Sequence, residues 1–146
     1  MRQLLLVLVA GLLVAAQEKD DPKKELDKFT GTWVVVSVEQ GGQKLPDDML
    51  KPLDLKLVIM GDKYESKSAG MTLDKGTLVV DGAKTPKIVD ITPMDGPNKG
   101  KKIPAIYEFS GEELKACYDI GGKERPKEFA TKPGTELVLV IYKKQK

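Results

Sequence analysis

The side chains that most often do chemistry in proteins are scarce in this chain, which has no histidine among its 146 residues. Histidine is the usual general base near neutral pH and the commonest zinc ligand. The acidic pairs Asp47-Asp48 and Glu112-Glu113 are sequence neighbours in expected turns, so their carboxylates would not converge as acid–base catalysis requires. The sequence therefore predicts a protein that is not an enzyme and that holds no metal and no cofactor.

One segment rich in glycine and lysine, residues 96–102, has part of the pattern of a phosphate-binding loop. Its glycines, Gly96 and Gly100, are one residue too close together for that motif, and Lys102 occupies the position of the Ser or Thr that would hold magnesium. The chain carries 24 basic and 22 acidic side chains, a net charge of +2. Nucleic-acid binding relies on a clustered excess of Lys and Arg, so we interpret the segment as a basic hairpin loop and expect no nucleic acid as partner.

The last candidate for chemistry is Arg125, the only arginine after Arg2. Its guanidinium could stack on Trp33 and close one end of the fold, or face a pocket and hold an anionic ligand. Asp90 stands in an otherwise apolar strand, and an inward carboxylate there would need a partner such as Arg125. An outward Asp90 is the alternative.

The elements that must position these residues begin at Gly31-Thr32-Trp33, which opens the β-branched run Val34-Val35-Val36. Runs of this kind favour strands, and a large aromatic residue at a strand's start typically anchors packing. We therefore expect Gly31 and Trp33 to close one end of a barrel. Asp21-Pro22 before Leu26 and Phe29 predicts a short helix ahead of that strand.

Further along the chain, alternating apolar and polar residues are separated by turn residues about every eight to twelve positions. This pattern predicts an all-β fold of antiparallel hairpins that close into a barrel or a sandwich, with a second short helical turn at Pro46 to Lys51. The first and last strands are expected to pair. Between the Trp33 strand and the end of the chain the expected strands are a hairpin over Leu55 to Lys67, then Met71 to Leu73, Thr77 to Val80, Lys87 to Thr92, Lys102 to Ser110, Glu113 to Asp119, Lys127 to Thr131 and Glu136 to Lys143.

The clearest alternation assigns an inward face to the two strands around residues 103–118. It places Cys117 outward, which conflicts with the usual burial of a free cysteine, and the sequence leaves this open. The expected inward residues are Ile103, Ala105, Tyr107, Phe109, Leu114, Ala116 and Tyr118. From these, Tyr107, Phe109 and Tyr118, together with Arg125, are the candidate ligand-binding residues.

The N-terminus has the pattern of an export signal, with Arg2 before an apolar run and small residues at Val14-Ala15-Ala16. The run is too short to span a bilayer, which needs about 20 apolar residues. We therefore predict a signal peptide over residues 1–16 cleaved near Ala16, a flexible charged leader over 17–25, and a barrel domain over 26–146. The mature protein is expected to be extracytoplasmic, periplasmic or secreted, without a membrane span.

A longer pattern resembles a known family. The segments GTWVVVSVEQGGQKLP, LKLVIMGDKY, PKIVDIT, GPNKGKKIPAIYEFSGEELKACYD and GKERPKEF together resemble the planctomycetal extracytoplasmic domain family of lipocalin-like (calycin) barrels, over about Leu26 to Tyr142. With the resemblance, we expect an exported, antiparallel lipocalin-like barrel of about 8–10 strands; the resemblance adds no activity. It also implies that Arg125 is the candidate for the late arginine that lipocalins place near their first tryptophan.

Two functions remain open for such a barrel. An eight-stranded barrel is just wide enough to be filled by side chains or to hold one small ligand, so the first is binding of a small apolar or amphipathic molecule. The second is an envelope-associated module with a filled core that binds a protein or polysaccharide through its outer loops. The content of only three Phe and one Trp slightly favours a filled aliphatic core.

Overall fold

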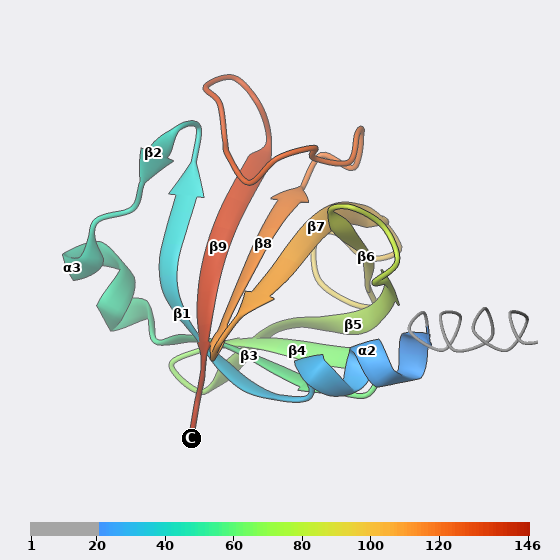
Figure 1. Cartoon of the computed structure of the whole chain (residues 1–146). Helices are drawn as coiled ribbons and strands as arrows, with labels where there is room; N and C mark the ends of the chain where they lie inside the picture. The colour runs from blue at the N-terminus through green and yellow to red at the C-terminus, as the bar shows by residue number, and fades with distance from the viewer. Residues whose placement is uncertain (1–20) are drawn as a thin grey trace, which may run out of the picture.

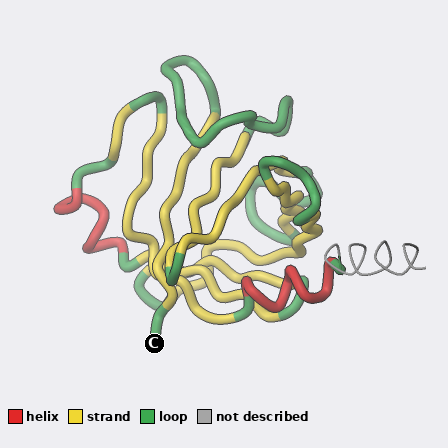
Figure 2. Tube along the Cα trace, in the orientation of Figure 1, coloured by secondary structure: helices red, strands yellow, loops and turns green. Residues whose placement is uncertain are grey.

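The computed structural model describes residues 21–146, and Figure 1 shows them as a strongly bent sheet flanked by short helices. The predicted signal peptide and residues 17–20 lie outside the described residues. Figure 2 shows that strands make up most of the fold. The helical elements are α2 (Pro22–Phe29), α3 (Asp47–Leu50) and the 3-10 turn η3 (Lys51–Leu53); the strands are β1 (Gly31–Gln40), β2 (Gln43–Lys44), β3 (Leu55–Met60), β4 (Lys63–Ser68), β5 (Met71–Asp81), β6 (Lys87–Pro93), β7 (Ile103–Ser110), β8 (Glu113–Asp119) and β9 (Leu137–Lys144).

The strands form an antiparallel barrel of eight, because β1 pairs with β3 on one side and with β9 on the other. The ninth strand, β2, pairs only with the end of β1. Closure removes the unpaired edges that a nearly flat sheet would expose. The predicted antiparallel all-β barrel of about 8–10 strands, and the pairing of its first and last strands, are confirmed.

Helix α2 begins where the sequence predicts, since the Asp21 side chain accepts from the Lys23 backbone N–H and Pro22 occupies the first turn. The leader predicted over 17–25 therefore ends earlier than expected, because the helix already starts at residue 22. Its Glu25 and Phe29 are buried against the barrel. Figure 1 shows α2 beside the β3–β5 part of the sheet.

Trp33 closes one end of the barrel, and it is only 2% exposed. Its indole Nε1 donates to the Phe29 carbonyl at 2.7 Å, and the ring lies 6.0 Å from that of Phe109. The cation over the indole is Lys144, with Nζ 5.4 Å from the ring centroid. A stack of Arg125 on Trp33 is therefore wrong. Gly31 has φ +138°, a conformation that residues other than glycine rarely adopt, so this position favours glycine.

Two predicted elements differ in the structure. Met71 to Leu73 and Thr77 to Val80 belong to the single strand β5, because Gly76 continues the ladder opposite Pro93 and is not a turn. A Cβ at Gly76 would collide with the Thr92 carbonyl oxygen, so the glycine permits close packing of two strands. The strand predicted over Lys127 to Thr131 is absent, and these residues form part of the loop between β8 and β9.

That loop, residues 120–136, covers the outer face of β8. Lys115 Nζ lies 4.9 Å from the centroid of the Phe129 ring, and the Cys117 thiol lies 3.6 Å from the Ala130 carbonyl oxygen. Asp119 accepts hydrogen bonds from three backbone N–H groups at the start of the loop, those of Gly121, Lys123 and Glu124. The outward register predicted for Cys117 is thus correct, and the thiol is nevertheless fully buried because the loop lies over it.

Candidate functional site

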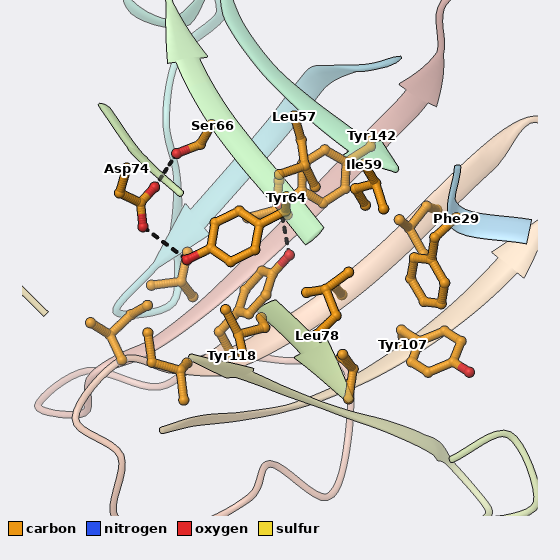
Figure 3. A pocket seen from close by; sticks show the side chains of 18 residues that line it. Phe29, Leu57, Ile59, Tyr64, Ser66, Asp74, Leu78, Tyr107, Tyr118 and Tyr142 are labelled. Atoms are coloured by element: carbon orange, nitrogen blue, oxygen red, sulfur yellow. Dashed lines mark hydrogen bonds between the residues drawn. The ribbon is translucent and has the colours of Figure 1, made fainter. Parts of the chain in front are cut away.

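A cavity of about 240 Å³ lies inside the barrel and is partly open to solvent. Figure 3 shows the side chains that face it. Its walls are mostly apolar, and among residues 21–146 Asp74 is the one lining residue with a charged side chain. The lining residues are Phe29, Leu57, Ile59, Tyr64, Ser66, Asp74, Leu78, Val89, Ile91, Ile103, Tyr107, Leu114, Ala116, Tyr118, Ile120, Val138, Val140 and Tyr142.

Strand alternation explains why these residues meet. On β8 the inward residues Leu114, Ala116 and Tyr118 line the cavity, while the residues between them face the covering loop. On β4 the same period turns Tyr64 and Ser66 inward. Asp74 lies directly opposite Ser66 across β4 and β5, and on β5 it shares the inward face of Leu78.

One polar group in the cavity is the hydroxyl pair of Tyr118 and Tyr142, whose oxygens lie 2.7 Å apart (Figure 3). Either oxygen can be the donor, and one bond between two hydroxyls leaves one O–H hydrogen unused. Burial raises the pKa of Tyr142 to about 12 and raises the pKa of Tyr118 well above its ordinary value. Both phenols are therefore neutral at physiological pH.

A second polar group surrounds Asp74. Its Oδ2 accepts from the Tyr64 hydroxyl at 3.0 Å, and its Oδ1 accepts from the Ser66 hydroxyl. Burial first, and the Asp74 charge second, raise the pKa of Tyr64 above its ordinary value. Within residues 21–146, no Lys or Arg nitrogen lies within ion-pair distance of Asp74.

Tyr107 faces the cavity with its ring and directs its hydroxyl away from it, to Glu25 Oε2 at 2.7 Å. Lys87 and Lys28 also contact the Glu25 carboxylate, at 3.4 and 3.2 Å. Burial would raise the pKa of Glu25, but the hydrogen bonds from Tyr107 and Lys28 and the two lysine charges outweigh it and lower the pKa. These contacts of Glu25 with Tyr107 and Lys87 hold α2 against the barrel wall.

Of the four candidate ligand residues, Tyr107 and Tyr118 line the cavity and the other two do not. Phe109 packs at the barrel end, where its ring centroid lies 4.9 Å from that of Phe29. Arg125 lies on the outer side, where its guanidinium bonds Asp90 Oδ1 at 2.7 Å and the carbonyl oxygens of Val89 and Ala105. Asp90 faces outward, between the inward Val89 and Ile91, so an inward Asp90 is wrong and the outward alternative is correct; its pair with Arg125 joins the loop to the outside of the sheet.

The sequence prediction missed Tyr64, Ser66, Asp74 and Tyr142. The alternation of Tyr64 and Ser66 along their predicted strand contained the signal for those two. Asp74 gave no such signal, because Gly76 has the local pattern of a turn, and only a strand that continues through Gly76 puts Asp74 on the face of Leu78.

Comparisons add no relative: no protein-family model matches the chain, and no curated protein matches it. Among residues 21–146, no group of three or more potential metal-ligating side chains occurs. None of the described helices has the length and apolar character needed to cross a bilayer. The cavity is therefore the feature from which a function is argued.

Proposed function

We propose that this protein is a non-enzymatic barrel that binds one small apolar or amphipathic molecule in its interior. The observation that carries the proposal is the cavity of about 240 Å³ with apolar walls and two localised polar groups. Sites for small molecules are typically apolar with a few placed polar atoms. A cavity of about 150 Å³ can hold benzene, and pockets for drug-sized ligands begin at about 300 Å³, so the molecule is small.

The cavity favours this function over the alternative of an envelope-associated interaction module with a filled core. Well-packed interiors contain few voids larger than a water molecule. A cavity of this size departs from such packing, and most of the residues that line it are buried.

Binding can be tested by titrating 1-hexanol into the protein in a calorimeter. We expect saturation at a one-to-one ratio with a negative heat-capacity change, because apolar surface is buried. Ala116→Leu should abolish binding by filling the cavity, and Arg125→Met should change the dissociation constant less than about twofold because Arg125 lies outside it. A wild-type protein that shows no saturable binding would contradict the proposal.

We also propose that the protein is exported and belongs to the planctomycetal extracytoplasmic domain family that it resembles. The N-terminal pattern of Arg2, an apolar run and Ala15-Ala16 supports export. Mass spectrometry of the protein from its native host is expected to give a chain that begins at Gln17. Soluble protein that retains Met1 would contradict export.

A further inference from the structure

The charged side chain at the cavity wall is the Asp74 carboxylate, which is negative. The arginine expected in the ligand site would have been positive. Arg125 pairs with Asp90 outside the cavity, and no Lys or Arg is among the lining residues. Asp74 brings a carboxylate to the cavity wall without a cation at ion-pair distance in residues 21–146.

We infer that the molecule bound in this cavity is a small apolar monoamine, whose ammonium group binds the Asp74 carboxylate while its hydrocarbon part occupies the apolar space. The inference rests on the proposed function and adds the chemical class of the ligand.

The Asp74 carboxylate still has free acceptor positions for an ammonium group. A carboxylate has about four acceptor positions, and Tyr64 and Ser66 use one on each oxygen. The two bonds hold the carboxylate in place, so an ammonium group would meet a pre-oriented acceptor. Asp74 is only partly buried, which lets a bound ammonium keep part of its hydration and reduces the desolvation penalty.

The rest of the cavity suits the hydrocarbon part. Figure 3 shows Asp74 and Ser66 toward one side of the view and Phe29 and Tyr107 toward the other. Phe29, Leu78 and Leu114 supply apolar walls, and the Tyr107 hydroxyl is already bonded to Glu25. Given that about 150 Å³ holds benzene, a cavity of about 240 Å³ fits an amine of roughly six to eight carbons.

An anionic ligand fits less well. A carboxylate in the cavity would meet the like charge of Asp74 without a lining cation to balance it. Unmatched like charges are a common source of discrimination between ligands.

Three probes of similar length and different charge test the inference at pH 7: hexylammonium, 1-hexanol and hexanoate. In calorimetry with the full mature chain, we expect hexylammonium to bind about tenfold more tightly than hexanoate, with 1-hexanol between them. Asp74→Asn should weaken hexylammonium binding about tenfold, the usual effect of losing a hydrogen bond to a charged group. It should change 1-hexanol binding less than about twofold. Asp62→Asn, at an exposed turn position, removes the same charge and should leave all three affinities unchanged.

These outcomes distinguish the amine inference from the proposed binding function on which it rests. If 1-hexanol saturates but hexylammonium binds no more tightly than hexanoate, the amine inference is wrong and the binding function stands. The same holds if Asp74→Asn binds hexylammonium as tightly as the wild type does. If none of the three probes saturates the wild-type protein, the proposed function fails and the inference with it. The wild-type ranking needs no variant, so it remains decisive even if Asp74→Asn does not fold.

Discussion

Trp33→Ala is expected to lower the free energy of unfolding by about 3–5 kcal/mol, the range for truncating a large aromatic residue in a core. The indole is 2% exposed, bonds the Phe29 carbonyl and packs beside Phe109. Its loss would leave a void where the N-terminal helix meets the first strand and would remove the partner of a backbone carbonyl. Urea denaturation followed by far-UV circular dichroism measures the effect.

Val79→Ala provides the matched control, because Val79 lies in a strand and is 68% exposed. We expect it to change the free energy of unfolding by less than about 0.5 kcal/mol. Trp33 is also the chain's only tryptophan, so the folded wild type should emit at short wavelength. A loss below about 1 kcal/mol for Trp33→Ala, or emission typical of an exposed indole, would show that Trp33 does not anchor the barrel.

Glu25→Ala is expected to cost about 2–3 kcal/mol, mainly because it leaves the buried Tyr107 hydroxyl without its acceptor. Lys28 and Lys87 contribute less, since their side chains are 55% and 37% exposed and solvent screens them. Asp27→Ala on the same helix is the control, because Asp27 is exposed and should change stability little. A double-mutant cycle with Tyr107→Phe measures the coupling, and a value near zero would contradict the role of this bond.

The same carboxylate makes stability depend on pH. The pKa of Glu25 is lowered in the folded protein, so the folded state binds fewer protons than the unfolded state near that pKa. The contribution of Glu25 is therefore complete above its ordinary pKa of 4.5 and is lost as the pH falls through the lower folded pKa. Denaturation between about pH 6 and pH 3 should show a steeper loss for the wild type than for Glu25→Ala. Parallel curves would show that Glu25 is not the group responsible.

Local sequence features determined the elements of this protein. The alternation in β7 and β8, the turns between strands and the Asp21-Pro22 helix start all act over a few residues, so they can be recognised without the fold. They predicted the closed barrel, the burial of Trp33 and the inward direction of Tyr107 and Tyr118. Gly76 misled the prediction because a glycine that permits close strand packing looks locally the same as one in a turn.

Which side chains meet in the cavity and on the outer face of the barrel depends on the tertiary structure. The period of a strand assigns each side chain to a face, but it cannot tell what covers that face. Cys117 points outward and is buried because a distant loop lies over it. Arg125 and Asp90 meet only when that loop folds onto the sheet. Asp74 faces the cavity because β5 continues through Gly76, which puts Asp74 on the same face as Leu78. The negative charge of the cavity wall therefore depends on Gly76 packing against β6 as part of a strand, which the local sequence does not distinguish from a turn.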